Sequence, residues 1–445
     1  MNKIKFYLSL LIARGAYFGI KALAHSSGTS FAGKIVLKFY PEFLSHCNTY
    51  INKKSITVSG TNGKTTTSGL ISHILEANNC SVIHNLKGAN MLTGVANVFA
   101  LTLAPFKRFD YSVIESDEAY LNKLYDYMKS DYLVVTNLFR DQLDRYGELT
   151  TTAALIQKAI DKNPELTLIL NADDPLVTNF GLNRNKVIYY GIENVEYDYE
   201  IEKSNAPTEV FNCICGKPLT YTKQFFAQQG HYSCTCGFKR PNCDYGADVK
   251  IFHDHSIINV KTRDNMYSFT TRLLGLYNAY NTLAAIAFAL ENNISPQTIQ
   301  NALDSYKSIF GRTEKKLING HEALIQLIKN PTGASEVLKT VDLSSRIIIA
   351  INDNYADGRD ISWLWDSDFE QLKHTQKQII TSGSRANDMA TRLKYAGVPS
   401  EKIKICPDIE KAINCAVQCS EPEDKITILP SYTALLKINK LHLKK

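Results

Sequence analysis

The sequence predicts an α/β protein with two domains of this class and one small inserted module. From residue 55, short runs of β-branched residues alternate with segments of helical pattern, as in parallel sheets with helices on both faces. The alternation breaks at 198–245, a polar stretch with five of the ten cysteines, and a second alternation begins after Gly311. The predicted parts are an N-terminal helical segment (1–50), a central domain (51–310) with an insert at 211–245, and a C-terminal domain (311–445).

The composition is that of a globular protein. Of the 445 residues, 44% are hydrophobic and 21% are charged, which suits large cores and argues against extended disorder. The net charge of +6 is small, so no nucleic-acid surface is predicted. Because the cysteines cluster, they favour metal binding in a reducing cytoplasm over disulfides in a secreted chain.

The N-terminal segment contains an apolar stretch at 6–24 that follows two lysines and is interrupted by Arg14 and Lys21. A membrane span or a signal peptide fits poorly, because cations lie inside the stretch and no small-residue cleavage site follows. The pattern predicts an amphipathic helix. Two placements stay open: packing on the body of the protein, or contact with the inner face of the membrane.

The predicted elements follow in order. In the central domain we expect strands at 55–60, 81–86, 111–116, 132–137 and 167–172, separated by helices at 64–78, 90–101, 119–127 and 150–161. Beyond the insert we expect strands near 248–260 and helices at 276–291 and 296–306. The C-terminal domain is predicted to be Rossmann-like, with strands at 345–353, 377–384 and 425–432 and helices at 334–340, 385–396 and 408–418.

The segment SITVSGTNGKTTTS indicates a phosphate loop between a buried strand and a helix. Backbone N–H groups and the positive helix end cradle phosphates, Lys64 reaches the β- and γ-phosphates, and the Thr65 hydroxyl binds magnesium. The Walker pattern is only partly met, since Val58 replaces the first glycine of that motif. The nucleotide-binding residues predicted here are Gly60, Thr61, Asn62, Gly63, Lys64, Thr65 and Thr66.

Acidic residues follow the third strand, at the sheet edge where ligands bind in such folds. Glu115 is predicted to bind Mg²⁺ beside the phosphate loop and to act in catalysis with Lys64. The alternative is that Glu115, Asp117 and Glu118 form a solvated loop after the strand. His84, Asn85 and Asn90 are candidates for substrate contact.

The segment GTNGKTT, followed in order by TNLFRDQLDRYGE, LNADDP, GLYNAYNTLAA and IFGRTE, resembles the Mur ligases and folylpolyglutamate synthases. The resemblance implies ATP and magnesium as cofactors, with Asn278 and Asn281 near the adenine and Arg312 near the phosphates. For the asparagines the alternative is an ordinary helix N-terminus. Asn137 and Asp144 are further candidates, and Gln142 stands where many relatives have histidine.

Two cysteine pairs, FNCICGKPL and HYSCTCGFKRP, resemble a zinc ribbon, in which two tight turns present four thiolates. The predicted zinc ligands are Cys213, Cys215, Cys234 and Cys236. Both pairs are C-x-C rather than the usual C-x-x-C, so Cys243 or His231 remains an alternative ligand. Four thiolates leave no open position, which predicts a structural site.

The C-terminal segments LIKNPTG and AINDNYADGRDISWLWD, together with the cysteine insert, resemble the MurT family, the Mur ligase-like subunits of lipid II isoglutaminyl synthase. Amino-acid-adding Mur ligases carry a substrate-recognition segment such as DNPR in their last domain, and no such segment follows residue 311. The resemblance implies that Asp360 completes the Cys-His pair of a GatD-like glutaminase partner across a heterodimer interface. The alternative is that Asp360 caps the next helix. Trp363 and Trp365 are candidate interface anchors.

The resemblance implies ATP-dependent amidation of the D-glutamate α-carboxylate of lipid II, through an acyl phosphate and with ammonia from the glutaminase. None of the cysteines outside the insert lies on a Gly-flanked turn typical of a nucleophile, so the chain itself is not expected to hydrolyse glutamine. Two alternatives remain. One is a stand-alone ligase that adds an amino acid, and the other is a nucleotide-binding regulator of a glutaminase.

Overall fold

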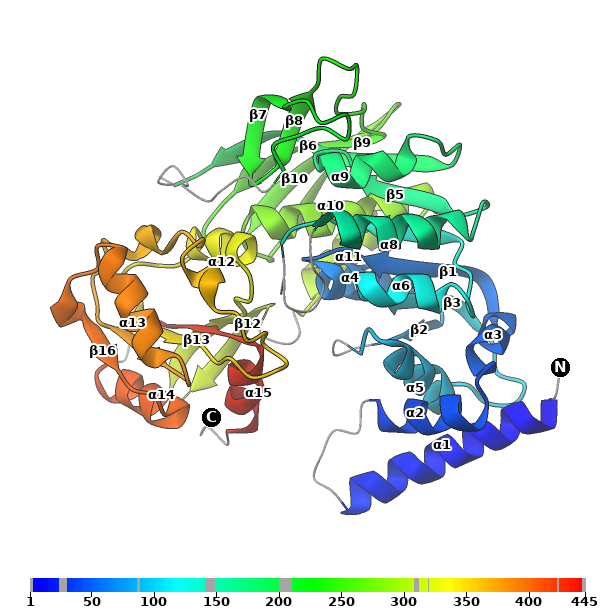
Figure 1. Cartoon of the computed structure of the whole chain (residues 1–445), viewed down its shortest axis with the longest axis horizontal. Coiled ribbons are helices and arrows are strands. Elements are labelled where there is room, and N and C mark those ends of the chain that lie inside the picture. The colour runs from blue at the N-terminus through cyan, green and yellow to red at the C-terminus, as the bar shows by residue number, and fades with distance from the viewer. Residues whose placement is uncertain are drawn as a thin grey trace.

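The α/β prediction is confirmed by a computed structural model, in which two mixed sheets are flanked by helices (Figure 1). The structure describes residues 3–23, 30–85, 89–140, 149–199, 210–307, 312–318, 320–421 and 424–441. Among these residues no helix is both long enough and apolar enough to cross a bilayer.

The central sheet has nine strands in the order β11-β10-β9-β6-β5-β4-β1-β3-β2. The neighbours from β2 to β9 pair in parallel, and β10 and β11 add an antiparallel edge. The strands are β1 (Ile51–Ser59), β2 (Val82–His84), β3 (Phe109–Glu115), β4 (Tyr132–Val135), β5 (Thr167–Asn171), β6 (Val187–Tyr197), β9 (Tyr245–Ile251), β10 (Ser256–Lys261) and β11 (Met266–Thr271).

Helices cover both faces of this sheet, as the alternation of buried residues along β4 shows. Val134 packs into one core, whereas Leu133 and Val135 pack into the other, because successive side chains of a strand point to opposite faces. The first core is covered by α4 (Lys64–Ala77), α10 (Leu276–Glu291) and α11 (Pro296–Ser305). The second is covered by α5 (Leu92–Thr102), α6 (Glu118–Leu124), α8 (Leu149–Asp161) and α9 (Pro175–Thr178), which continues into η2 (Asn179–Gly181).

The predicted N-terminal helix is present as α1 (Lys3–Leu23). It packs on α2 (Phe31–Phe39) and α5, and its buried residues Phe6, Leu10 and Ala13 join the second core. Two short helices, α3 (Phe43–Cys47) and η1 (Asn48–Tyr50), lead into β1. The prediction that this helix packs on the body is therefore confirmed for one of its faces.

The insert forms a two-stranded antiparallel hairpin of β7 (Thr220–Phe226) and β8 (Gln229–Ser233). Phe226 packs in the first core of the central domain. The Tyr232 hydroxyl lies 2.5 Å from Thr178 Oγ1 and 3.2 Å from the Ala172 carbonyl oxygen. These contacts place the hairpin against the carboxyl edge of the central sheet.

The C-terminal domain is built on a six-stranded sheet in the order β12-β13-β17-β14-β15-β16. Only the β12-β13 pair is antiparallel. The strands are β12 (Arg312–Ile318), β13 (His321–Gln326), β14 (Arg346–Ala350), β15 (Ile379–Ser382), β16 (Ile403–Ile405) and β17 (Ile426–Pro430). The helices are α12 (Pro331–Leu338), α13 (Ala386–Tyr395), α14 (Ile409–Gln418) and α15 (Tyr432–Lys440), with 3₁₀ turns η3 (Ser362–Leu364), η4 (Phe369–Leu372) and η5 (Ser400–Lys402).

Candidate functional site

The phosphate loop lies between β1 and α4, as the sequence predicts. Gly60 and Gly63 have φ of 123° and 86°, a region that L side chains rarely adopt. A Cβ at Gly63 would lie 1.9 Å from Asn281 Oδ1, and one at Gly60 would lie 2.4 Å from Thr136 Oγ1. Both glycines are therefore required by conformation and by space.

The Thr136–Asn137 pair after β4 fastens the loop. The Asn62 N–H donates to Asn137 Oδ1 at 2.8 Å, and the Thr136 hydroxyl donates to the Asn62 carbonyl oxygen at 2.7 Å. The Thr61 hydroxyl is held between the Phe139 N–H and carbonyl groups. Asn137 thus acts on the loop directly, whereas the candidates Gln142 and Asp144 lie outside the described residues.

Lys64 is buried and forms an ion pair with Glu118. Its Nζ lies 2.8 Å from Glu118 Oε2 and donates to the Gly60 carbonyl oxygen at 2.5 Å. Burial lowers the pKa of Lys64, but the charges of Glu118, Asp117 and Glu115 outweigh burial and raise it above its ordinary value. The ammonium is therefore charged and held at the loop. Glu118 is not a solvated-loop residue, since it is only 8% exposed.

Glu115 ends β3 and is buried beside the same loop. Its Oε1 accepts a hydrogen bond from the Asn90 amide at 3.3 Å, and its backbone N–H donates to Asn85 Oδ1. None of the described residues bonds to Glu115 Oε2. A buried carboxylate oxygen without a partner suits a cation, so the donor set fits magnesium together with Thr65, which is partly exposed in the first turn of α4.

The other candidates for substrate contact have structural contacts here. The Asn85 amide donates to the Glu115 and Ala89 carbonyl oxygens, which fixes the end of β3. His84 Nε2 lies 3.2 Å from Ser68 Oγ, and burial lowers the pKa of His84 to about 4. His84 is therefore neutral at physiological pH.

A cleft lies in front of the loop, between the central domain, the hairpin of the insert and α12. It is lined by Gly63 and Thr66 from the loop region, Asn281, Phe226 of β7, and Lys329 and Thr332 before and within α12. Apolar and amide surfaces next to a phosphate loop suit a nucleoside. Phe226 and Thr332 are lining residues that sequence reasoning missed, because no nucleotide motif contains them.

The two asparagines of α10 differ in placement. Asn281 lines the cleft, while Asn278 is buried behind it. The Asn278 amide donates to the Leu274 carbonyl oxygen at 2.8 Å, and Asn278 Oδ1 accepts from the Asn281 amide at 3.2 Å. Asn278 thus orients Asn281. Arg312 begins β12, but its side chain lies outside the described residues.

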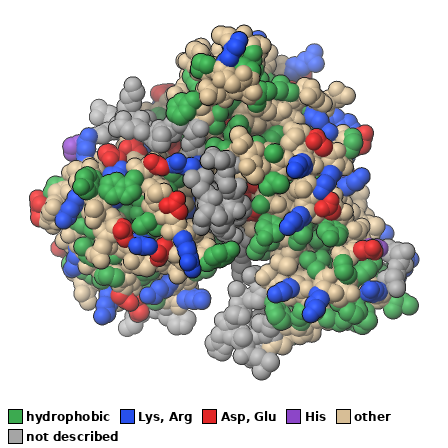
Figure 2. Space-filling view, viewed as in Figure 1, with side chains coloured by type: hydrophobic (Ala, Val, Ile, Leu, Met, Phe, Trp, Pro, Cys, Tyr) green, Lys and Arg blue, Asp and Glu red, His purple; other side chains and the backbone are tan. Residues whose placement is uncertain are grey.

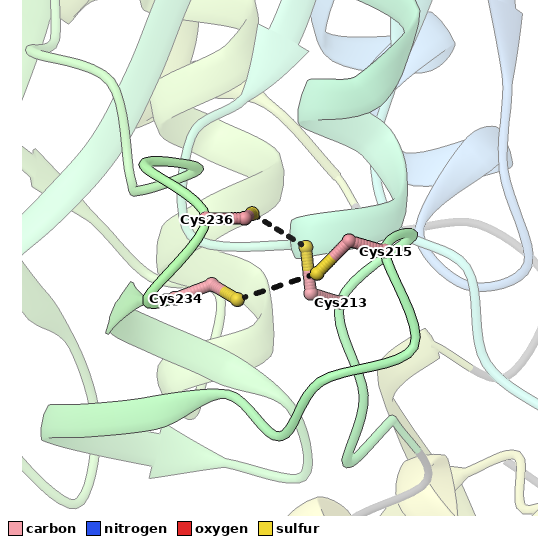
Figure 3. Close-up of side chains that lie close together, drawn as sticks. All are labelled: Cys213, Cys215, Cys234 and Cys236. Atoms are coloured by element: carbon pink, nitrogen blue, oxygen red, sulfur yellow. Dashed lines mark hydrogen bonds between the residues drawn. The ribbon is translucent and has the colours of Figure 1, made fainter.

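The four predicted zinc ligands lie together (Figure 3), with their sulfur atoms within 4.8 Å of one another. The two C-x-C-G turns have the same backbone pattern. The Gly216 and Gly237 N–H groups donate to the Cys213 and Cys234 carbonyl oxygens, and both glycines have positive φ. Each turn is thus a tight knuckle, and the cluster can hold a tetrahedral metal ion.

The two alternative zinc ligands, Cys243 and His231, make other contacts. Cys243 Sγ accepts a hydrogen bond from Arg240, and His231 Nε2 lies 2.9 Å from the Ile192 carbonyl oxygen. Arg240 also pairs with the buried Asp173, which accepts the Tyr280 hydroxyl of α10 at 2.7 Å. This network connects the insert to the helix that carries Asn281.

Asp360 is exposed in the segment between β14 and η3. One of its oxygens accepts the Ser362 N–H at 2.8 Å. The N-cap residue of η3 is Ile361, without a side-chain cap hydrogen bond, so Asp360 is not the cap of this turn. Asp357 anchors the same segment by accepting hydrogen bonds from the Thr433 N–H and hydroxyl groups. Asp360 lines a small hollow with Trp363 and Lys329. Because Lys329 also lines the cleft, the two depressions adjoin.

Asn330, the N-cap of α12, reaches the phosphate loop from the C-terminal domain. Its amide donates to Asn62 Oδ1 at 3.0 Å and its Oδ1 accepts from the Asn62 amide at 3.3 Å. Asn330 Oδ1 also accepts the Gly333 N–H. The sequence marked KNPTG as a distinctive segment but gave Asn330 no role, since nothing in the pattern shows that it meets Asn62.

This fold and this phosphate loop define a Mur ligase-type protein. The model of the Mur ligase middle domain matches residues 58–289, and that of the MurT ligase C-terminal domain matches 327–435. The chain belongs to the MurT family. It is 35% identical over 412 residues to the lipid II isoglutaminyl synthase (glutamine-hydrolyzing) subunit MurT of Staphylococcus aureus (strain COL), covering 92% of this chain and 91% of that protein.

A second relative and two solved structures are also similar to this chain. The subunit of the same name from Streptococcus pneumoniae (strain ATCC BAA-255 / R6) is 34% identical over 448 residues, covering 98% and 97% of the two chains. Among solved structures, a pseudomurein peptide ligase type C from Methanothermus fervidus has a TM-score of 0.67 at 23% identity, covering 92% and 84%. MurF from Thermotoga maritima, solved in complex with ADP, has a TM-score of 0.64 at 13% identity, covering 93% and 84%. These structures show the fold alone.

Proposed function

We propose that this chain is the synthetase subunit of a lipid II isoglutaminyl synthase, which amidates the D-glutamate α-carboxylate of lipid II. The observation that carries the proposal is the similarity to MurT subunits along 92% or more of the chain. The phosphate loop and the adjoining cleft supply the site that such an ATP-dependent reaction needs. The stand-alone ligase is less well supported, because the C-terminal domain matches the MurT model.

In the proposed reaction, the γ-phosphoryl group of ATP passes to the substrate carboxylate to form an acyl phosphate, and ADP leaves. Ammonia then attacks the acyl carbon, so that an amide forms and phosphate leaves. Lys64, charged and held at the loop, stabilises the negative charge of the transferring group. Asn281 orients the nucleoside beside Gly63. Magnesium, when bound by Glu115 and Thr65, neutralises phosphate charge.

Ammonia is supplied in this proposal by a GatD-like glutaminase bound at the face around Asp360. The Asp360 carboxylate orients a histidine of that partner and stabilises its imidazolium form. Support comes from exposed aromatic side chains on this domain: Trp365 is 53% exposed and Tyr395, whose ring contacts it, is 75% exposed. Such residues are typical anchors of protein interfaces. The adjoining cleft would receive the ammonia released nearby.

The cysteine cluster is proposed to bind a structural zinc ion. Four thiolates satisfy a tetrahedral ion and leave no position for substrate. The metal would hold the hairpin whose Phe226 lines the cleft, and its contribution to folding of such a module is roughly 10 to 16 kcal/mol.

The proposal is tested by co-expressing the chain with a glutaminase-like protein of the same genome and assaying lipid II with glutamine and ATP. We expect amidation by the pair, and Asp360→Asn should abolish glutamine hydrolysis while amidation with added ammonium salts persists. Asp264→Asn, at an exposed position between β10 and β11, is the control. If the pair forms but Lys64→Met and Glu115→Gln leave amidation intact, the chain is a regulator and not a synthetase.

A further inference from the structure

The N-terminal helix α1 is apolar on its outer side as well as on its packed side. Ile4, Leu8, Leu11 and Phe18 are 81%, 45%, 65% and 66% exposed. Their spacing of four, three and seven residues puts them on one face of a helix. The packed residues Phe6, Leu10 and Ala13 lie on the opposite side. The exposed stripe is therefore not needed for the core.

This stripe lies at the edge of the molecule. Helices α2 and α5 separate α1 from the central sheet, and α1 forms the outermost layer of that end (Figure 1). Figure 2 shows hydrophobic side chains along this lower edge, with Lys and Arg side chains beside them. A row of large exposed hydrophobic residues in one line is unusual for a monomer and indicates a binding surface.

The charge of this end is strongly one-sided. Residues 1–41 contain six Lys or Arg residues and no Asp or Glu, which equals the net charge of the whole chain, +6. On α2, Lys34 and Lys38 are exposed beside Phe31 and Phe39, which are 46% and 37% exposed. The remaining 404 residues are thus formally neutral in sum. Basic residues around an apolar stripe complement anionic lipid headgroups.

A loop after α5 extends the same surface. Phe106 is fully exposed at positive φ, and Lys107 and Arg108 follow it. The Arg14 side chain of α1 donates to the Leu103 carbonyl oxygen, so the loop starts beside the helix. An exposed aromatic residue followed by two cations repeats the chemistry of α1 and α2.

We propose that α1, α2 and the loop at 104–108 dock this protein on the surface of an anionic phospholipid bilayer, with α1 lying in the membrane plane. Ile4, Leu8, Leu11 and Phe18 enter the boundary between headgroups and acyl chains, and the surrounding lysines contact the headgroups. The inference rests on the helix and its charge, and it does not depend on amidation. It fits a substrate that is itself carried on a lipid.

The test is flotation of the full-length chain with vesicles of phosphatidylglycerol and phosphatidylcholine, compared with vesicles of phosphatidylcholine alone. We expect binding to the anionic vesicles that weakens as salt is raised. Leu11→Ser with Phe18→Ser should weaken binding at least about tenfold, because two exposed side chains lose their burial in lipid. Lys34→Gln with Lys38→Gln should weaken it about tenfold and flatten the salt dependence.

The matched control is Met266→Ser with Leu317→Ser, which removes two side chains of similar exposure, 68% and 62%, from distant strands. This control should bind as the wild type does. The proposal is overturned if the wild type ignores anionic vesicles, or if the α1 variant binds them equally well. A dimer that becomes monomeric in the α1 variant, without vesicle binding by the wild type, would instead make the stripe a contact between copies of the chain.

Discussion

The ammonium group of Lys64 donates to three acceptors in this structure: the Gly60 and Thr61 carbonyl oxygens and Glu118 Oε2. Before nucleotide arrives, Glu118 and the Gly60 carbonyl oxygen hold Lys64 in place. In the proposed reaction, phosphate oxygens of ATP replace part of this set. The buried pair keeps the ammonium charged and close to its target, so that little rearrangement is needed when ATP binds.

Replacing Lys64 separates its role in stability from its role in catalysis. Lys64→Met removes the charge at the phosphates, and we expect amidation to fall at least about 100-fold. It also leaves buried Glu118 unpaired, which costs about 3 kcal/mol or more in stability. The double variant Lys64→Met with Glu118→Gln should recover thermal stability but not activity. Lys54→Met, at an exposed pair with Asp131, should change neither, and recovered activity in the double variant would contradict the phosphate role.

His84 predicts a dependence of stability on pH. Burial lowers its pKa from 6.5 to about 4, so between these values the unfolded chain binds a proton that the folded chain does not. The contribution of His84 is fully present above pH 6.5 and is lost as pH falls toward 4. Over this pH range the contribution of His84 to the free energy of unfolding falls by about 3 kcal/mol. Thermal unfolding of His84→Gln and wild type from pH 7 to 4 should show a shallower loss in the variant, and parallel curves would refute the assignment.

At the residue scale, the sequence predicted the groups that belong to a local motif. Lys64, Glu115 and the four clustered cysteines lie where their spacing indicated, because a strand end or a tight turn fixes them within a few residues. Glu118 and Asn330 could not be given roles, since their partners are 54 and 268 residues away. Such pairings depend on how strands and domains come together.

Elements with a strong hydrophobic period were predicted well, whereas several short or edge elements and the long interior strand β6 were missed. Helix α10 lies at the predicted residues 276–291, because its face of alanine and large apolar residues is continuous and buried. Strands β12 and β13 escaped prediction, since β12 carries charged residues along an exposed edge. The hairpin β7-β8 lies in the polar insert, where hydrophobic alternation is weak and the cysteine turns fix the backbone.

Removal of metal tests the insert as an element. Cys234→Ser leaves three thiolates, and we expect loss of bound zinc, a lower unfolding temperature and weaker ATP binding, because the hairpin with Phe226 loses its anchor. Cys243→Ser is the matched control, since Cys243 bonds to Arg240 outside the cluster. Metal content by elemental analysis and ATP affinity by calorimetry are the measurements. Equal zinc in both variants would exclude the cluster as the site.

On the scale of the whole molecule, the cleft proposed to bind the nucleotide is lined by three parts of the chain. The central domain supplies the loop, the insert supplies Phe226 and the C-terminal domain supplies Lys329 and Thr332. The domains meet through Asn62 and Asn330, and through the ion pair of Arg140 with Asp366. Substitution of Asn62 or Asn330 should therefore weaken binding of the nucleotide.

Asn330→Ser is expected to weaken the contact between the domains without unfolding α12. The serine oxygen can still cap the helix, but it is too short to keep both hydrogen bonds to Asn62. Loss of those hydrogen bonds makes the contact between the domains about 1 to 2 kcal/mol less favourable. ATP binding should therefore weaken about tenfold. The unfolding temperature should stay close to that of the wild type.

The matched variant is Asn330→Asp, which also caps α12 but places a carboxylate against Asn62 Oδ1 and near the phosphates. It should weaken ATP binding more than Asn330→Ser does, and by an amount that shrinks as salt is raised, because part of the loss is charge repulsion. Calorimetry of both variants at two salt concentrations checks this. If both bind ATP as tightly as the wild type, closure of the C-terminal domain is set by other contacts, and the Arg140–Asp366 pair is the next to remove.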